Sequence, residues 1–330
     1  MSRSLRFSQA VGEAIAHELE ADPKVLALGE DIGRSGGVFA VTRGLQERFG
    51  EDRVRDTPIS EMGFTGMGVG LAMAGYRPLV EIMFVDFIGV CLEQVMNAMS
   101  KIPYMSGGQV RIPMVLKTAG GCIGSAAQHS QCLWGLFAHL PGMRVVCPAS
   151  PVDYKGMMAA AIQSDDPVIY IENKRMLNKL CSVYPIDNDV PHERYTRPLT
   201  GAKVVRTGSD VTIATISASV GDALAAAEDL KGAGIDVEVV DLRSLCPLDV
   251  DTLAGSVGKT GRLLVVDEDF LSYGMSGEVV ASVVEALGPT ALRAVARHAM
   301  PDVPLPAART LEEALVPGAA SIAAAVRRLG

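Results

Sequence analysis

The sequence predicts two α/β domains, a larger one built on a doubly wound parallel sheet and a smaller one that follows it. Through the first 173 residues, short runs rich in β-branched residues alternate with helical patterns, which is typical of parallel strands joined by crossover helices. A polar stretch with three prolines follows at 174–200, and the alternation then resumes. We therefore expect a first domain over 1–185, a linker over 186–200 and a second α/β domain over 201–330.

The elements of the first domain follow from hydrophobic periodicity. Helices are expected at 7–22, 38–49, 61–75, 86–101, 131–140 and 152–163. Buried strands are expected between them at 25–31, 53–59, 77–84, 113–120, 143–150 and 167–173. Ser60 and Ser150 stand where a helix needs an N-cap, since a serine hydroxyl accepts a hydrogen bond from an N–H of the first turn.

In the second domain the same periodicity predicts four strands and three helices. The strands are expected at 211–217, 236–245, 262–269 and 291–299, and the helices at 220–233, 249–257 and 275–287. The alternation again indicates an α/β domain, smaller than the first.

Composition excludes several classes of function. Of the 330 residues, 48% are hydrophobic and 21% are charged, as in an ordinary globular protein with a sizeable core. The net charge of −8 and the lack of a basic stripe argue against nucleic-acid binding. No apolar run approaches the roughly 20 residues of a membrane span, and no signal peptide is evident. Six cysteines form no C-x-x-C pair, so we expect reduced core residues in a cytoplasmic protein.

The most informative segment is DTPISEMGFTGMGVGLAMAG at 56–75. Glu61 stands at the start of a helix of small and apolar residues, and no other acidic or basic residue follows it until Arg77. Four glycines in this helix each cost about 0.5–1 kcal/mol relative to alanine, so we expect close contact with another backbone. A lone carboxylate here suggests chemistry, although a favourable interaction with the helix dipole would also explain it. The glycines do not complete the dinucleotide-binding fingerprint.

A second candidate is His129 in the glycine-rich segment GGCIGSAAQHSQ at 120–131. It follows an expected strand, at the end where parallel α/β sheets bind ligands, and histidine can move protons near neutral pH. The alternative is a loop histidine bonded to its polar neighbours. His139 is expected to be structural at a helix end. Phe84 and Phe87 close another strand, where an aromatic ring could stack on a ligand, although we expect Phe84 to be core.

Several catalytic motifs are missing from the sequence. It contains no nucleophile elbow, no P-loop and no pair of histidines with metal-ligand spacing. It also lacks a Gly-Asp-Gly run followed by an asparagine, the pattern that would hold a Mg²⁺-diphosphate.

Together, these motifs resemble the beta subunit of the thiamine-diphosphate-dependent dehydrogenases of 2-oxoacid dehydrogenase complexes, a transketolase-like family that includes the pyruvate, acetoin and branched-chain enzymes. The resemblance covers nearly the whole chain. It rests on DTPISE, the glycine-rich helix, E-x-x-F-x-D-F (81–87), YMSGG (104–108), AAQHSQ (126–131), H-x-P-G-x-x-V-V-x-P (139–148), VEVVDLRSLCPLD and TGRLLVVDED. It implies a pyrimidine-binding domain followed by a domain like the transketolase C-terminal domain.

The resemblance assigns roles to four residues. Glu61 matches the glutamate that hydrogen-bonds the pyrimidine ring of the cofactor and stabilises its imino tautomer, which generates the ylid that attacks the 2-oxoacid. Phe87 matches the ring that stacks on the pyrimidine, and Met83 matches a neighbouring pocket position. His129 matches the histidine near the substrate and the lipoyl group, where it supports proton transfer.

The resemblance also implies ions and partners. A potassium ion would be held at Met114, Ala161, Ile162, Ser164 and Asp166, since carbonyls at a helix end are unpaired and partly negative. Because the Mg²⁺-diphosphate motif is missing, a separate alpha subunit would hold the diphosphate and Mg²⁺ in an α2β2 heterotetramer. The second domain would join two beta subunits and contact the lipoyl acyltransferase core.

Alternatives stay open for the substrate and for the class of protein. AAQHSQ is closer to the pyruvate and acetoin types than to the branched-chain type, but GGCIGS and EDFLSYGMSGE differ from the usual patterns, so the 2-oxoacid or acetoin substrate stays open. A half-subunit of a transketolase-type enzyme would need basic residues near His129 to bind sugar phosphates, and few are present. A non-catalytic scaffold would tolerate Glu61→Gln.

Overall fold

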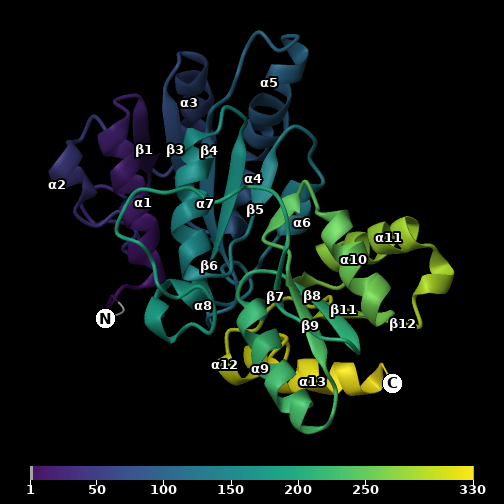
Figure 1. The fold of residues 1–330 in the computed structure, drawn as a ribbon. Helices are drawn as coiled ribbons and strands as arrows, with labels where there is room; N and C mark the ends of the chain where they lie inside the picture. Colours follow the sequence, from purple (N-terminus) through teal and green to yellow (C-terminus); the bar gives the residue numbers. More distant parts are fainter. Residues whose placement is uncertain (1–2, 330) are drawn as a thin grey trace. The chain divides into compact units, whose positions relative to one another are not determined.

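The structure, a computed structural model that describes residues 3–329, contains two α/β units, each with a largely parallel sheet (Figure 1). The expected fold class is therefore confirmed. The first unit comprises the residues up to Gly120 together with Phe137–Val146 and Ser150–Leu199. The second comprises Gly121–Leu136, Cys147–Ala149 and the described residues from Thr200 onward.

The sheet of the first unit gathers the carboxyl ends of its strands at one edge. The strands are β1 (Val25–Gly29), β2 (Val54–Asp56), β3 (Arg77–Ile82), β4 (Val115–Gly120), β5 (Arg144–Val146) and β6 (Val168–Asn173). They run in the order β5-β6-β4-β3-β1-β2 with parallel pairing. All residues of β4 and β6 are buried, as expected for a parallel sheet covered on both faces.

Three helices position the parts of this unit that matter for function. Helices α1 (Phe7–Ala21) and α7 (Pro151–Gln163) lie side by side in front of the sheet in Figure 1, whereas α3 (Glu61–Met73) packs on β3. Ser150 caps α7 as predicted, because its Oγ accepts a bond of 3.2 Å from the N–H of Asp153. The expected cap at Ser60 is wrong, since its side chain makes no cap hydrogen bond.

The glycines of α3 contact side chains, so the expected contact with another backbone is wrong. A Cβ on Gly68 would lie 2.5 Å from the Val80 side chain on β3 and 3.1 Å from that of Met114. A Cβ on Gly66 would lie 3.0 Å from the Gln94 side chain, and one on Gly70 would contact nothing. Gly68 is thus the glycine that lets α3 pack closely on the sheet.

Other expected helices differ in length. Only α2 (Leu45–Phe49) forms within 38–49, because Ala40 and Gly44 have positive φ angles of 58° and 78° that interrupt a helix. Within 131–140 only α6 (Trp134–Ala138) forms, after Leu133 with φ 49°. The helix expected at 86–101 is a composite that runs on to Met105. Its parts are η1 (Val85–Phe87), α4 (Ile88–Glu93), the π-helix η2 (Gln94–Met99) and α5 (Ser100–Met105).

The polar stretch at 174–200 contains two short elements. These are α8 (Lys174–Leu177) and η3 (Cys181–Val183).

The second unit is built on a sheet in the order β12-β11-β8-β9-β7. Its strands are β7 (Lys203–Arg206), β8 (Val211–Thr215), β9 (Val237–Asp241), β11 (Arg262–Phe270) and β12 (Ala294–Met300). The edge strand β7 pairs antiparallel with β9 and was not expected from the sequence. The other pairs are parallel.

The helices of the second unit surround a core of small aliphatic side chains. Helices α9 and α13 pack together over a cluster that includes Ile213, Val239 and Leu264. The remaining elements are β10 (Ser244–Cys246), α9 (Ser219–Gly232), α10 (Val250–Thr260), α11 (Met275–Leu287), η4 (Pro289–Ala291), α12 (Arg309–Glu313) and α13 (Ala319–Arg328). None of the helices described over 3–329 has the length and hydrophobicity that crossing a membrane requires.

Candidate active site

Three candidate residues lie at the carboxyl edge of the first unit's sheet. Because Gly29 on β1 is in register with Glu81 on β3, the residues that follow these two strands come together. Glu30 follows β1 directly and Met83 follows β3. Glu61 is half-buried at the first position of α3, which packs on β3. The structure therefore brings Glu61 and Met83, both named from the sequence, to an edge where ligands bind in such folds.

Glu30 is a candidate that sequence reasoning missed. Burial raises the pKa of its carboxyl group, and the charges of Glu61 and Asp31 raise it further, so Glu30 and Glu61 interact. Its Oε1 atom is buried and has no hydrogen-bond partner in the described part of the chain. Two neighbouring carboxyl groups of this kind favour binding a proton or a donor group of a ligand. The signal in the sequence was an acid placed directly after the buried strand VLALG.

Cys91 in α4 is a possible nucleophile near Glu61, but its thiol is not activated. Cys91 is buried there, and burial raises the pKa of its thiol. The charge of Glu61 raises that pKa further. Cys91 therefore stays a protonated thiol near neutral pH, which suits a packing role and not nucleophilic catalysis.

Three aromatic rings from the segments after β1 and β3 pack against one another and form an aromatic wall. Phe84 and Phe87 pack edge to face at 5.6 Å between centroids, and Phe84 does the same with Phe39 at 6.1 Å. The Nζ atom of Lys174 lies 4.9 Å from the centre of the Phe84 ring. Phe84, expected as core, is half-buried like Phe87. The ring of Phe84 is thus held on several sides and in turn fixes the ring of Phe87.

A buried row of charges crosses three neighbouring strands of the sheet. Lys117 on β4 lies between Glu81 on β3, at 2.9 Å, and Glu172 on β6, at 2.8 Å. Burial lowers the pKa of Lys117, but the charges and hydrogen bonds of both glutamates outweigh it and leave the pKa above its ordinary value. Burial raises the pKa of Glu172 to about 6 despite the opposing charge of Lys117. The row fixes Glu81, two residues before Met83.

His129 belongs to the second unit, as does the loop that carries it. The loop is closed by a 3.0 Å bond from the N–H of Gly121 to the carbonyl of Gln131. It is also fastened by a 2.5 Å bond from the N–H of Gly124 to the Glu312 carboxylate on α12. His129 is half-buried, and its backbone N–H donates to the carbonyl of Ala126 at 3.3 Å. The loop therefore has a defined conformation that presents the imidazole in part to solvent.

After this loop, buried acids of β11 hold the next segment within the same unit. The indole Nε1–H of Trp134 donates to Asp267 at 2.9 Å. Burial, followed by the charge of Asp269, raises the pKa of Asp267 to about 7. This interaction ties the region next to the His129 loop to the core of the second unit.

Protein donors bond to the carbonyls of the residues predicted to hold potassium. Each of the five accepts a hydrogen bond from a protein donor: Met114, Ala161, Ile162, Ser164 and Asp166. Arg77, a cation, is the donor to two of them. Within residues 3–329, no cluster of three or more His, Cys, Asp or Glu side chains could hold a metal ion.

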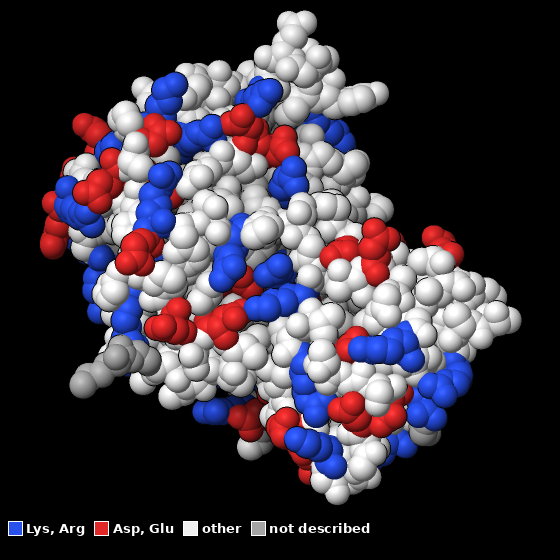
Figure 2. All heavy atoms as spheres, in the orientation of Figure 1, with Lys and Arg blue, Asp and Glu red and all other residues white. Residues whose placement is uncertain are grey.

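The surface shows no feature of a nucleic-acid site on the face seen in Figure 2. Lysine and arginine side chains there are interspersed with aspartate and glutamate and form no continuous basic stripe. This distribution agrees with the net charge of −8.

Comparison with known proteins identifies the family. Residues 3–179 match the model of the transketolase pyrimidine-binding domain, and residues 200–322 match that of the transketolase C-terminal domain. The chain is 42% identical to the acetoin:2,6-dichlorophenolindophenol oxidoreductase subunit beta of Cupriavidus necator, over 99% of this chain and 98% of the relative. It is 41% identical to the pyruvate dehydrogenase E1 component subunit beta-1, mitochondrial, of Arabidopsis thaliana, over 99% of this chain and 90% of the relative.

A solved structure supports the fold alone. It is described as a split gene transketolase in an inactive beta4 tetramer, and the similarity has a TM-score of 0.78 at 24% identity over 99% of this chain and 98% of the other. The domain matches and the relatives lead to one conclusion about the family. The chain belongs to the family of beta subunits of thiamine-diphosphate-dependent 2-oxoacid and acetoin dehydrogenases, within the transketolase-like superfamily.

Proposed function

We propose that this chain is the beta subunit of an oxidoreductase that acts on a 2-oxoacid of the pyruvate type or on acetoin and passes the acyl group to a lipoyl carrier. One observation carries the proposal: Glu61 and Glu30 interact at the carboxyl edge of the sheet, inside a domain that matches the transketolase pyrimidine-binding domain. Relatives over nearly the full length are named as beta subunits of such enzymes.

Thiamine diphosphate, when bound, supplies the electron sink that cleavage next to a carbonyl requires. Glu61 would hold the pyrimidine edge and share a proton with it. Glu61 is half-buried at the first position of α3, at the edge where ligands bind in such folds. Glu30, with its unpartnered Oε1, offers a second acceptor beside Glu61.

The remaining site residues would shape the pocket and move protons. Phe87, held edge to face by Phe84, would stack on the pyrimidine, and Met83 would line the same pocket. His129 would hold or release a proton near the substrate during acyl transfer, a role of general acid–base type worth about 10²–10⁴ in rate. These assignments rest on matching positions of the family pattern and on the placement of Glu61, Met83 and Phe87 within one unit.

An alpha subunit is the partner that this proposal needs. It would hold the diphosphate and Mg²⁺, in keeping with the lack of a metal cluster among residues 3–329 of this chain. Exposed apolar side chains in the first unit offer surface for partners. They are Ile59, Met62, Met67, Met73, Tyr104 and Met105. We propose an α2β2 heterotetramer with a second beta subunit, attached to a lipoyl acyltransferase core.

Potassium is not part of the proposal, because protein groups already bond to its predicted ligands. A location in the cytoplasm stays a prediction from the sequence. Among substrates, AAQHSQ favours pyruvate or acetoin over a branched-chain 2-oxoacid.

The test is reconstitution with the alpha subunit. The co-expressed complex should reduce an artificial electron acceptor with pyruvate or acetoin only when thiamine diphosphate is added. Glu61→Gln should lower the rate by about 10²–10⁴ with unchanged thermal unfolding. Glu47→Gln is the matched control, because Glu47 is also an acid in the first turn of a helix, α2, and is exposed. Full activity of the Glu61→Gln complex would refute the assignment, and turnover by the purified chain without a partner would refute the need for an alpha subunit.

A further inference from the structure

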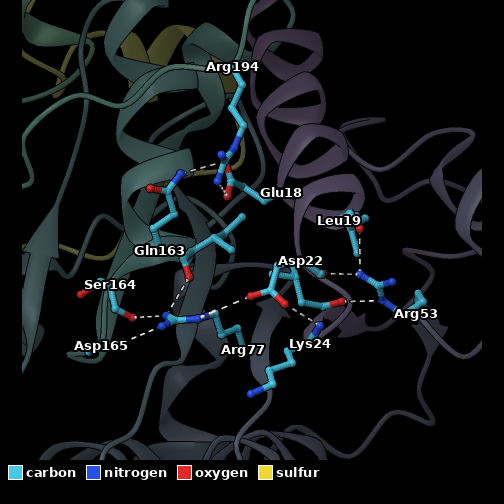
Figure 3. Close-up of polar contacts among 12 residues, drawn as sticks. Glu18, Leu19, Asp22, Lys24, Arg53, Arg77, Gln163, Ser164, Asp165 and Arg194 are labelled. Carbon is cyan, nitrogen blue, oxygen red and sulfur yellow. Dashed lines mark hydrogen bonds and ion pairs between the residues drawn. The ribbon is translucent and has the colours of Figure 1, made fainter.

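The C-terminal end of α7 is closed by the side chain of Arg77, the first residue of β3. Its Nη1 donates to the carbonyls of Ile162, at 3.3 Å, and Ser164, at 2.9 Å. Its Nη2 pairs with Asp165 at 2.5 Å, and its Nε faces Asp22 at 3.8 Å. Figure 3 shows Arg77 between Asp22 on one side and Ser164 and Asp165 on the other. A positive charge is favoured here, because the last carbonyls of a helix are partly negative.

The other carbonyls at this helix end have donors as well. The carbonyl of Met114 accepts from the N–H of Val168 at 3.0 Å, and that of Ala161 accepts from the N–H of Ser164 at 3.2 Å. The carbonyl of Asp166 accepts from the Ser164 hydroxyl at 2.9 Å. With the two carbonyls that Arg77 serves, all five oxygens predicted to hold potassium are hydrogen-bonded to protein groups. The segment thus forms a hydrogen-bond network in which each of these oxygens has a protein donor.

Charge around the helix end is also balanced without an ion. Arg111 pairs with Asp165 at 2.7 Å, and Arg144 pairs with Asp166 at 2.9 Å. The hydrogen bond from Arg77, with burial opposing it, is the largest influence that holds the pKa of Asp165 below its ordinary value. Three arginines thus face three aspartates, counting the one at the end of α1. A potassium ion among these carbonyls would lie next to the Arg77 guanidinium and be repelled by it.

The neighbouring helix ends in the same way. Arg53, directly before β2, donates from Nη2 to the carbonyls of Leu19, at 2.9 Å, and Asp22, at 2.8 Å. Its Nε donates to the carbonyl of Val25 at 2.6 Å. Figure 3 shows this second guanidinium at the end of α1 beside Leu19 and Asp22. A guanidinium from a residue at or just before the start of a strand therefore satisfies a helix C-terminus twice in this unit.

We propose that Arg77 acts as a built-in cation at the end of α7 and takes the place of a monovalent metal ion there. The chain then binds no potassium at these carbonyls. Thermal stability of the protein should not depend on whether potassium is present.

Thermal unfolding of the full chain tests this at equal ionic strength, in about 0.1 M potassium chloride or choline chloride. The wild-type midpoint should agree within about 1 °C between the two salts. Arg77→Met should lower the midpoint in choline chloride by roughly 3–8 °C, because it leaves carbonyls and Asp165 without their donor. Potassium should restore part of this loss. Arg111→Met is the matched control: it removes a guanidinium from the same Asp165, but Arg111 is exposed and should change the midpoint little.

Rubidium, a potassium substitute with strong anomalous scattering, gives a direct readout in crystals of the wild-type protein. The expected result is no anomalous peak among the five carbonyls. A peak there, or a wild-type midpoint that rises clearly in potassium chloride, would overturn the proposal. If Arg77→Met does not fold, the wild-type rubidium map and salt comparison still decide. Neither readout uses enzyme activity, so failure here leaves the proposed function untouched.

Discussion

Replacing Lys117 with methionine should destabilise the protein strongly at neutral and higher pH. Its ammonium group is the shared counter-ion of Glu81, at 2.9 Å, and Glu172, at 2.8 Å. The Lys117 side chain is 2% exposed and that of Glu172 is 0% exposed. Methionine fills a similar volume but leaves two carboxylates facing each other inside the sheet. The structure therefore isolates the effect of one buried charge.

The size of the effect follows from the cost of an uncompensated buried charge. Removing one partner of a buried ion pair costs about 3–5 kcal/mol. For domains of this size, each kcal/mol shifts the unfolding midpoint by roughly 2–4 °C. We therefore expect Lys117→Met to lower the midpoint by roughly 6–20 °C at pH about 8.

The loss of stability in Lys117→Met should shrink as pH falls, and the direction of this change follows from the pKa of Glu172. Burial raises its folded pKa to about 6, above the ordinary value of 4.5, even with Lys117 beside it. Without Lys117 this pKa rises further, because its lowering influence is gone. An acidic group whose pKa is raised in the folded state lowers the free energy of unfolding at pH values above that pKa. This cost disappears as the pH falls toward the pKa of the same group in the unfolded state. The variant should thus approach the wild type between pH about 8 and about 5.

The assay is chemical denaturation of both proteins across this pH range. Lys155→Met is the matched control, since Lys155 is 1% exposed but pairs with a single carboxylate, Glu13, that is 29% exposed. Its loss of stability should vary much less between pH about 5 and about 8. A cost for Lys117→Met below about 1 kcal/mol, or a cost that stays constant with pH, would refute the reasoning.

Two further predictions concern the aromatic wall and the second unit. Phe84→Leu removes an edge-to-face contact with Phe87 worth about 0.5–1.5 kcal/mol. The KM of the reconstituted complex for thiamine diphosphate should therefore rise roughly 2–10-fold, and kcat should change little. Phe49→Leu is the control, and equal KM values would contradict the positioning role. Asp267 has its pKa raised to about 7 by burial and then by Asp269, so wild-type stability should fall as pH rises from about 4 to about 7. Asp267→Asn should flatten this dependence of stability on pH, measured by urea unfolding. An unchanged pH dependence would count against the role assigned to Asp267.

Regular elements were predictable from the sequence wherever periodicity and local chemistry agree. The helix at 275–287 has the expected bounds in α11, and Ser150 caps α7 as its sequence context indicates. The helix expected at 38–49 failed because Ala40 adopts a positive φ that no local signal announces. Ser60 failed as a cap because its side chain makes no bond to the first turn of α3.

The candidate site was likewise predictable from the sequence only in part. Glu61 was identifiable because its sequence neighbours are small and apolar, whereas Glu30 becomes its neighbour only through the pairing of β1 with β3. Residues 81, 117 and 172 form a row only because β3, β4 and β6 are adjacent in the sheet. The assigned roles of Met83 and Phe87 stay predictions, and Phe84→Leu tests that of Phe87 through its ring contact.

The potassium prediction at the end of α7 came from the family resemblance, supported by the unpaired carbonyls of a helix end. Counting unpaired carbonyls along the sequence correctly marks a region of negative potential at the end of a helix. It gives no information about the donor, because Arg77 precedes Ile162 by 85 positions and reaches it only when β3 lies beside α7. A helix end that needs positive charge can obtain it from an ion or from a side chain, and the two exclude each other electrostatically. The same potential that predicts potassium therefore predicts Arg77, and only the tertiary fold decides between them.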